Sequence, residues 1–325
     1  MTAVASARQL DLLVLGDLNP DLILSGEDVQ PAFGQVERLV DAAELTIGGS
    51  GAIVACGAAR LGLSTAIVGV VGADLFGRFM RDALGERGVD VSAVVVDPSA
   101  RTGLTVILSR PADRAILTFP GTISALTPTH VDRELIRSAR HVHVSSFFLQ
   151  TALAEGLGAL LAEARAAGAS TSVDPNWDPQ ERWNGGLRGV LRHTSVFLPN
   201  GQEVVRIADE QDPEAAARAL AAEGPLVAVK LGADGALAAR QGEITRVSAP
   251  PGIDALDTTG AGDSFDAGVI AGLLAGWSIP QVLSMGCVCG ALSTQGLGGT
   301  TAQPTREQAL ELLNPDVAPS GATPR

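Results

Sequence analysis

Short apolar runs alternate with helix-like segments along most of the 325-residue chain. Short runs made mainly of apolar and small residues are typical of strands that are buried on both faces of a sheet. They occupy residues 12–15, 65–71, 142–144, 170–173, 195–198 and 226–230. The segments of helical composition or periodicity occupy residues 51–61, 75–86, 152–167 and 213–223. This alternation predicts an α/β fold with a mostly parallel central sheet and helices on both faces.

Two segments interrupt this alternation. Residues 18–47 and about 101–119 contain shorter runs in which apolar and polar positions alternate, such as TGLTVIL and AILTF. A period of two is typical of half-buried antiparallel strands, and Pro111, Ala112 and Asp113 are suited to a turn between two of them. We expect these strands to pair into a small sheet that covers the ligand-binding cleft. Ordinary edge hairpins are the alternative.

A glycine-rich turn, TTGAGDSF, stands before an apolar run at 267–274. Gly260, Ala261 and Gly262 carry almost no side chain, so their backbone N–H groups can approach a ligand closely. The apolar run predicts a helix that begins at this turn, and free N–H groups at a helix start favour an anion such as phosphate. Asp263 adds a carboxylate there, which is useful where an attacking hydroxyl must lose a proton. The turn predicts a kinase active site; a turn capped by an aspartate is the alternative.

Composition excludes several function classes. The net charge is −13, from 36 acidic and 23 basic residues, which argues against electrostatic binding to nucleic acid or to an anionic membrane. Lys230 is the only lysine, so the chain lacks the Gly-Lys-Ser/Thr of a P-loop kinase. Cys56, Cys287 and Cys289 are too few for a disulfide framework and lack the spacing of a zinc site.

The chain also lacks the patterns of export and membrane insertion. Residues 1–9 contain no long apolar stretch, and no segment supplies the roughly 20 apolar residues that a bilayer span requires. We therefore expect a cytoplasmic protein.

The glycine-rich turn belongs to a longer motif. The run from Asp257 to Phe265, DTTGAGDSF, closely resembles the C-terminal signature of the ribokinase-like (PfkB) carbohydrate kinases. About 200 residues earlier, GGSGAIVACGAARLG at 48–62 resembles the N-terminal signature of the same family. Ile53 departs from that signature, because such kinases commonly carry an asparagine there that contacts the substrate.

The resemblance implies a fold and a reaction. The fold is a ribokinase-like three-layer sandwich over residues 11–312, with a small β-sheet lid inserted from 18–47 and 101–119. Residues 313–325 are expected to form a disordered tail. The implied reaction moves the γ-phosphoryl of ATP to a primary hydroxyl of a small sugar of the pentose or hexose class. Asp263 is then the general base, and the N–H groups of Gly260, Ala261 and Gly262 form the anion hole.

The resemblance also implies an acceptor site beyond the ends of the parallel strands, where α/β folds bind ligands. Asn19 and Asp21 follow the first strand in the run GDLNPD and match positions that bind acceptor hydroxyls, although this run also suits a turn. The glycine-rich helix start would contact the sugar through Gly48, Gly49 and Ser50, and close helix packing is its alternative. Ser146, which follows the strand at 142–144, matches another acceptor contact.

The nucleotide, metal and cation positions are carried over in the same way. The implied nucleotide-binding residues are Asn200, Lys230, Gly232, Gly235 and Cys287. Glu203, in an Asn-x-x-Glu motif, is expected to act on Mg²⁺ through water, with help from Asp174. A helix start is the alternative for this motif, and a tight hairpin is the alternative for the loop after Lys230. Asp257 and Thr259, together with backbone carbonyls around residues 294–301, resemble a site for a monovalent cation such as K⁺.

Other readings remain open at this stage. A nucleoside or vitamin-precursor kinase on the same scaffold is one, because Ile53 makes a less polar acceptor conceivable. A non-catalytic sugar sensor is another, although the intact Asp263 and glycine turn argue against it. The exposed edge strands of the lid predict a homodimer.

Overall fold

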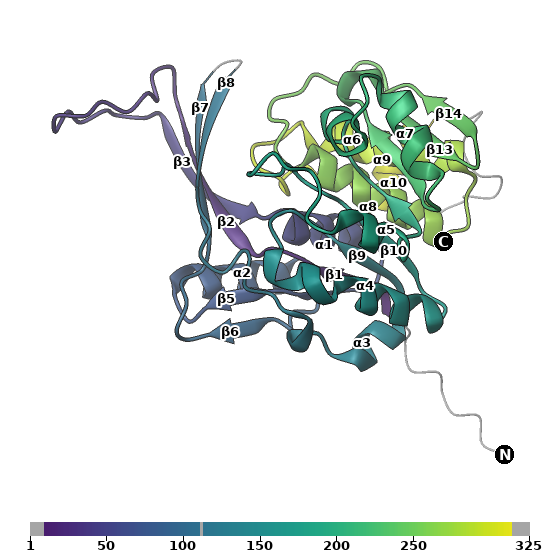
Figure 1. The fold of residues 1–325 in the computed structure, drawn as a ribbon. Coiled ribbons are helices and arrows are strands. Elements are labelled where there is room, and N and C mark those ends of the chain that lie inside the picture. Colours follow the sequence, from purple (N-terminus) through teal and green to yellow (C-terminus); the bar gives the residue numbers. More distant parts are fainter. Residues whose placement is uncertain (1–9, 111–112, 314–325) are drawn as a thin grey trace.

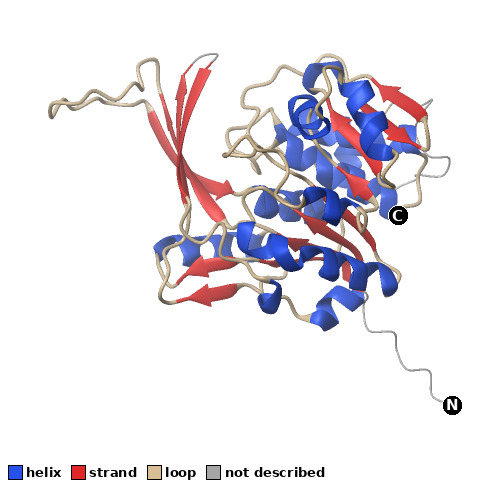
Figure 2. Cartoon of the chain, viewed as in Figure 1, coloured by secondary structure: helices blue, strands red, loops and turns tan. Residues whose placement is uncertain are grey.

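An eight-stranded sheet forms the centre of the molecule (Figures 1 and 2). The structure is a computed structural model that describes residues 10–110 and 113–313. The strand order is β14-β13-β12-β11-β10-β9-β1-β4, and the pairs from β12 to β4 are parallel whereas β13 and β14 pair antiparallel. The strands are β1 (Leu10–Leu15), β4 (Thr65–Val68), β9 (Ala139–Val144), β10 (Ser170–Val173), β11 (Val196–Phe197), β12 (Leu226–Lys230), β13 (Ala236–Arg240) and β14 (Glu243–Val247).

Helices cover both faces of this sheet, as the alternating pattern predicts. Successive residues of β1 point to opposite faces. Leu13 and Leu15 pack in one apolar cluster with helices α3 to α7, whereas Leu12 and Val14 pack in another with α1, α2, α8, α9 and α10. The helices are α1 (Ser50–Arg60), α2 (Leu75–Glu86), α3 (Arg133–Ser138), α4 (Thr151–Ala166), α5 (Leu187–Leu191), α6 (Gly201–Ala208), α7 (Pro213–Ala221), α8 (Ala261–Leu274), α9 (Ile279–Ser293) and α10 (Arg306–Leu312), with short 3-10 turns at η1 (Pro128–His130) and η2 (Gly232–Asp234).

One predicted strand is wrong in its extent. Residues 65–71 form two strands, β4 and β5 (Val70–Gly72), and β5 leaves the central sheet to pair with β6 (Val95–Asp97). The break falls at Gly69, where a side chain would begin only 2.6 Å from the Gly16 carbonyl oxygen. The close approach of Gly16, just after β1, therefore coincides with the point where the chain leaves the central sheet.

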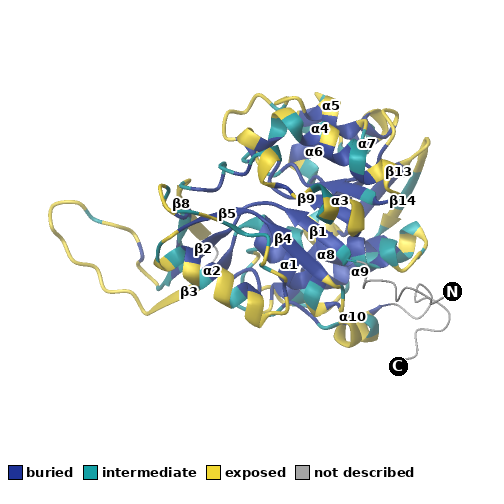
Figure 3. Cartoon of the chain, turned by 90° about the horizontal axis from the view of Figure 1, so that it is seen from below, coloured by how far each residue is buried: buried dark blue, intermediate teal, exposed yellow. Residues whose placement is uncertain are grey.

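A second sheet projects from the body (Figure 1). Its strands, in the order β3-β2-β7-β8, come from the two segments that interrupt the sequence pattern. They are β2 (Asn19–Ser25), β3 (Ala42–Gly48), β7 (Leu104–Arg110) and β8 (Asp113–Phe119), and we call them the lid sheet. The loop at 26–41 extends beyond the sheet and is mostly exposed (Figure 3). The expected turn residues Pro111 and Ala112 lie outside the described residues, as does the predicted tail apart from Leu313, which is buried.

The pairing register places a polar row and the adjacent apolar row on opposite faces of the lid sheet. Paired residues share a face of a sheet. One face, the inner face, carries the polar row Asp21, Thr46, Thr105 and Thr118. The neighbouring row, Leu22, Leu45, Val106 and Leu117, forms an apolar outer face. Leu117 on this outer face is 62% exposed.

No helix in the described ranges is both long and apolar enough to span a bilayer.

Candidate active site

Two helices, α1 and α8, each begin after a glycine whose φ is positive. This φ is 79° at Gly49 and 70° at Gly260. A Cβ at Gly260 would lie 2.7 Å from the Cα of Gly299, so only glycine fits there. Both predicted glycine-rich helix starts are therefore confirmed as helix starts.

The N-terminus of α8 presents free backbone donors. Within the described part of the chain, the N–H groups of Gly260, Gly262 and Asp263 have no acceptor. The N–H of Ala261 differs from the expectation, because it donates to the Thr258 carbonyl over 3.3 Å. The Asp263 carboxylate caps no amide of α8, so the alternative of an aspartate-capped turn is wrong. This end of the helix has the donors that an anion needs.

Asp263 is half-buried on the first turn of α8. Burial raises the pKa of its carboxyl to about 7, and the charge of Asp174 raises it further, while Lys230 and the Ser50 side chain oppose the rise. A carboxyl with a pKa near neutral pH is well suited to exchange a proton with a hydroxyl.

Lys230 lies at the end of β12 inside a cluster of carboxylates. Its Nζ donates to Asp174 Oδ2 over 2.5 Å and to Asp266 Oδ1 over 3.1 Å. Burial opposes the charges of Lys230 and Asp174, but their attraction outweighs it, so the pKa of Lys230 is raised and that of Asp174 lowered. Burial raises the pKa of Asp266 far above its usual range. The cluster thus sets one ammonium against two carboxyl groups, of which Asp266 is the more easily protonated.

This cluster lies directly against the glycine turn. A Cβ on Gly262 would be 3.6 Å from Lys230 Nζ. The sequence predicts that Lys230 contacts nucleotide phosphate. In the structure its ammonium donates to Asp174 and Asp266, and the sequence did not indicate either partner. Asp266, three residues after Asp263 on the helix, was not singled out by any motif.

Asp17, in the loop after β1, and Asn19, the first residue of β2, lie at the N-terminus of α1. Asp17 was not assigned a role from the sequence, yet its carboxylate accepts from the N–H groups of Gly51 over 3.0 Å and Ser50 over 3.2 Å. Asn19 Nδ2 donates to Thr105 of the lid sheet over 3.3 Å, and its buried Oδ1 has no partner among the described residues. A polar residue directly after a buried strand was the signal that pointed to this loop.

The carboxylate of Asp21 lies against Gly48, one of the two glycines that precede α1. A Cβ on Gly48 would lie 2.0 Å from Asp21 Oδ1, so glycine is required for the carboxylate to fit. Burial raises the pKa of Asp21 to about 7, and the charge of Asp17 raises it further. Asp21 is therefore ready to be either a donor or an acceptor for a polar ligand near neutral pH.

Ser146 and Asn176 adopt a backbone that non-glycine residues rarely use, with φ of 55° and 54°. Asn176 Nδ2 donates to Ser146 Oγ over 3.1 Å and is 3.4 Å from Ser50 Oγ. The hydroxyl of Ser145 is buried without a partner among the described residues. Strained backbone of this kind concentrates at functional sites. The loops after β9 and β10 thus meet the start of α1 here.

Asn200 and Glu203 form a reciprocal cap at the start of α6. Asn200 Oδ1 accepts from the Glu203 N–H over 2.9 Å, and Glu203 Oε2 accepts from the Asn200 N–H over 2.8 Å. The helix-start reading of the Asn-x-x-Glu motif is therefore confirmed. Burial raises the pKa of Glu203 to about 7, with a further contribution from the charge of Asp174.

The carboxylates of Asp174, Glu203 and Asp263 suit a divalent cation whose ligands are mainly water and phosphate. Asp174 raises the pKa of both Glu203 and Asp263, so these groups lie close enough to repel one another. A cation between them would relieve that repulsion. Within the described ranges, no three His, Cys, Asp or Glu side chains converge as a metal-binding group. This arrangement suits Mg²⁺, which keeps water and phosphate ligands.

The expected nucleotide loop has a structural reason for its glycines. Gly232 and Gly235 have φ of 60° and 91°, and a Cβ on Gly235 would lie 2.1 Å from the Val247 carbonyl oxygen. The loop joins β12 to the antiparallel β13, so the hairpin reading is confirmed. Cys287 is buried on α9, and burial raises the pKa of its thiol to about 12. The position of Cys287 on α9 therefore does not decide whether this residue contacts a nucleotide.

Asp257 and Thr259 stand immediately before the glycine turn. Asp257 Oδ1 accepts from the N–H and the hydroxyl of Thr259, over 2.9 and 2.7 Å, and Oδ2 accepts from the Gly298 N–H over 2.8 Å. Arg114 of β8 reaches both residues, with Nη1 2.8 Å from Thr259 Oγ1 and 3.4 Å from Asp257 Oδ1. Sequence reasoning did not find Arg114, because nothing in a lone exposed arginine indicates a partner 143 residues away.

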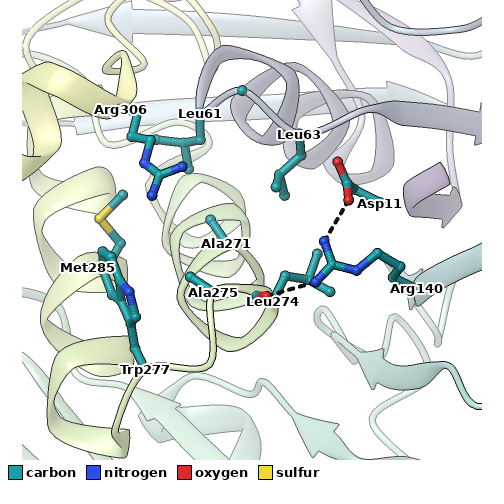
Figure 4. A pocket seen from close by; sticks show the side chains of 11 residues that line it. Asp11, Leu61, Leu63, Arg140, Ala271, Leu274, Ala275, Trp277, Met285 and Arg306 are labelled. Carbon is teal, nitrogen blue, oxygen red and sulfur yellow. Dashed lines mark hydrogen bonds and ion pairs between the residues drawn. The ribbon is translucent and has the colours of Figure 1, made fainter. Parts of the chain in front are cut away.

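A hollow of about 440 Å³ lies elsewhere (Figure 4). Leu61 and Leu63, just after α1, line it together with Leu274, the last residue of α8. Figure 4 shows Arg140 between Asp11 and Leu274 at its edge. The hollow is therefore at the opposite ends of α1 and α8 from the helix starts described above, and it is separate from them.

Comparisons with known proteins agree with this geometry. Residues 9–306 match the model of the pfkB family carbohydrate kinases. A fructokinase from Klebsiella pneumoniae is 32% identical over 318 residues, which cover 92% of this chain and 98% of that protein. The crystal structure of a ribokinase II from E. coli in complex with ATP and Mg²⁺ is 25% identical, with a TM-score of 0.82 over 93% of this chain and 98% of that one.

A further structure is that of a Vibrio cholerae fructokinase double mutant in its fructose-, ADP- and potassium-bound form. It is 26% identical and has a TM-score of 0.78, with coverage of 95% of this chain and 100% of that one. The fold is thus ribokinase-like, a mostly parallel sheet between two helical layers with a separate small sheet. The chain belongs to the pfkB family of carbohydrate kinases and is a sugar kinase, a phosphotransferase that acts on a sugar hydroxyl.

Proposed function

We propose that this kinase transfers the γ-phosphoryl of ATP to a primary hydroxyl of a pentose or hexose, with Asp263 as the general base. One observation carries the proposal. A carboxyl with a pKa near 7 stands on the same helical turn as three backbone N–H groups that have no acceptor in the described structure. The base and the anion donors that phosphoryl transfer requires are therefore adjacent.

The chain's own residues divide the work. The Asp263 carboxylate takes the proton from the acceptor hydroxyl as that oxygen attacks phosphorus. The N–H groups of Gly260, Gly262 and Asp263 hold the charge on the transferred phosphoryl, and one such donor contributes ~2.7–4 kcal/mol in comparable sites. The sequence-based assignment of Ala261 to this role is replaced by Asp263, because the Ala261 amide is already bonded to Thr258.

The acceptor lies, in this proposal, between the lid sheet and the start of α1. Asn19, Asp21, Ser50 and Ser146 would bind its hydroxyls, with Gly48 and Gly49 leaving room for the ring. The buried, unpartnered Asn19 Oδ1 supports this placement, because a polar ligand would satisfy it. Ile53 contributes no polar contact. Its side chain packs under Gly260 and Gly299 instead, where it fills the space below the turn.

ATP and Mg²⁺ are the proposed cofactors. Asn200, Lys230, Gly232, Gly235 and Cys287 would lie along the nucleotide. Mg²⁺, when bound, would neutralise charge on the nucleotide phosphates. Glu203 would orient its water ligands, and Asp174 would add negative charge nearby. Lys230 favours phosphate at Gly262 through its charge, although its Nζ also donates to two carboxylates.

We also propose a homodimer that forms through the outer face of the lid sheet. Leu45, Leu117 and Phe119 on this face are 39%, 62% and 53% exposed. Such an apolar patch favours burial against a second copy more strongly than the strand edges do. Light scattering at micromolar concentration should give the dimer mass for the native chain and the monomer mass for Leu117→Asp; a native monomer would contradict the proposal. The cytoplasmic location expected from the sequence stays a prediction.

An ADP-release assay across a panel of sugars and nucleosides tests the function. We expect a pentose or hexose to accelerate ADP release in the native enzyme and not in Asp263→Asn. Acceleration by nucleosides alone would favour the nucleoside kinase, for which the apolar Ile53 is the supporting residue. Ligand-induced thermal stabilisation without any turnover would favour the sugar sensor.

A further inference from the structure

Arg114 is placed on the inner face of the lid sheet. It shares a face of β8 with Ile116 and Thr118, and Thr118 lies opposite Thr105 in the polar inner row. Its guanidinium therefore points toward the body and meets Thr259 and Asp257 there. The side chain of Asp257 is only 14% exposed, so this is a partly desolvated contact.

Four hydrogen-bond donors surround the carboxylate of Asp257. Oδ1 faces the Thr259 N–H, the Thr259 hydroxyl and the Arg114 guanidinium, while Oδ2 accepts from the Gly298 N–H and, among the described residues, keeps one free lone pair. The same guanidinium donates to Thr259 Oγ1. A monovalent cation at Asp257 and Thr259 would therefore meet a positive charge that is already in place, so Arg114 and the cation compete for this position.

A positive charge is required beside this carboxylate. Asp257 belongs to the segment that leads into Gly260, and its hydrogen bonds to Thr259 hold that segment in place. Its negative charge also reaches the acceptor loop, where it raises the pKa of Asp21 and Arg114 lowers it. An uncompensated carboxylate here would oppose the arrival of phosphate at the neighbouring N–H groups.

We propose that Arg114 supplies, from the lid sheet, the positive charge that a monovalent cation would otherwise supply at Asp257 and Thr259. Arginine stays charged at all working pH values, and its planar fork can serve the carboxylate and the hydroxyl together. Arg114 is thus a positioning residue, and its charge reaches the glycine turn only when the lid sheet approaches the body. The kinase consequently needs no K⁺. The turnover measurements that test this inference depend on the proposed function, whereas the melting temperatures do not.

The test compares KCl with choline chloride at equal ionic strength. The native enzyme should show the same turnover and the same melting temperature in both salts. Arg114→Ala should lose about fivefold to tenfold in turnover in choline chloride, the loss expected for one charge-assisted contact. KCl should restore most of that turnover and raise the melting temperature of this variant by about 2–4 °C, because the freed carboxylate then binds the cation.

Arg110→Ala is the matched control. Arg110 stands on the same hairpin, but its guanidinium pairs with the exposed Asp113 instead of with the body. This variant should behave like the native enzyme in both salts. The substitution thereby separates a general loss of lid charge from the loss of the specific contact.

Two results would overturn the inference. One is a native enzyme whose turnover or melting temperature depends on K⁺. The other is an Arg114→Ala variant whose melting temperature does not respond to K⁺, whether or not its turnover falls. If no acceptor supports turnover at all, the proposed function fails, while the melting measurements still decide the role of Arg114.

Discussion

The starts of α1 and α8 each follow a glycine of positive φ but differ in their chemistry. Each carries the partial positive charge of a helix N-terminus. At α1 the first amides are occupied by the Asp17 carboxylate, which is supplied by a loop 33 residues away. At α8 the amides of Gly262 and Asp263 have no acceptor within the described structure.

This difference decides which ligand each end can take. An internal carboxylate already neutralises the N-terminus of α1, so a second anion there would meet the charge of Asp17 as well as that of Asp21. Uncharged hydroxyl groups remain suitable partners. The N-terminus of α8 is open and has the Lys230 ammonium beside it, which favours phosphate. In the proposed function, the acceptor would therefore lie at the start of α1 and the phosphoryl group at the start of α8.

Replacement of Asp263 by Asn removes the base and leaves the open helix start intact. Turnover should fall by roughly 10²–10⁴-fold, because general base catalysis contributes about that much, while acceptor binding is kept. Steady-state kinetics and acceptor titrations measure the two effects. Asp254→Asn is the control, since Asp254 is exposed in the loop before the turn. Near-native turnover in Asp263→Asn would remove this residue from the role of base.

Replacement of Lys230 by Met tests the charge beside the open helix start. The buried Asp174 would lose its counter-charge, which costs about 3–5 kcal/mol of unfolding free energy in comparable buried pairs. Urea denaturation monitored by tryptophan fluorescence measures the change. Restoring neutrality with Lys230→Met plus Asp174→Asn should recover much of the loss. A single variant as stable as the native protein would show that the cluster is not a coupled buried pair.

The proposed role of Asp263 also predicts how activity and stability depend on pH. Because Asp263 must be ionised to accept a proton and its pKa is about 7, kcat/KM should fall about tenfold per unit as pH drops below 7. The stability of the ligand-free protein should change in the opposite sense. Asp263, Asp21 and Glu203 all have folded-state pKa values raised to about 7, so the folded state binds more protons between the ordinary values and 7.

The unfolding free energy should therefore decrease as pH rises through that window, and the decrease should be smaller in Asp263→Asn. Denaturation curves at several pH values, run without nucleotide, measure this. A stability that increases steadily from acidic to neutral pH would contradict the assigned shifts.

Asp17→Asn gives the smallest expected effect and probes the closed helix start. Asparagine offers one acceptor oxygen instead of two, so one of the Ser50 and Gly51 amides loses its partner. The loss should be about 1 kcal/mol of unfolding free energy, the usual size of a helix cap. Thermal denaturation detects it, and Asp11→Asn is a suitable comparison because Asp11 caps no helix start. An unchanged stability would mean that the two helix starts do not differ as described.

Local sequence patterns were sufficient for much of the fold. Residues 75–86 and 226–230 form the predicted elements with the same bounds, because an apolar stripe or run that will be buried can be recognised from the spacing of residues. The break at Gly69 was missed, because it depends on the Gly16 carbonyl that the fold brings beside it. The two segments of the lid sheet were found, but which of their faces is apolar depends on strand register.

The amino-acid sequence alone determined the family, the alternation of strands and helices and the position of the glycine turn with its aspartate, since each of these depends on neighbours along the chain. Only the tertiary structure decided that Asp17 closes one helix start, that Lys230 is committed to Asp174 and Asp266, and that Arg114 reaches Asp257. These pairings join residues 33, 56, 36 and 143 positions apart. Electrostatic partners act through space, so their identity follows from packing and cannot be read from spacing along the chain.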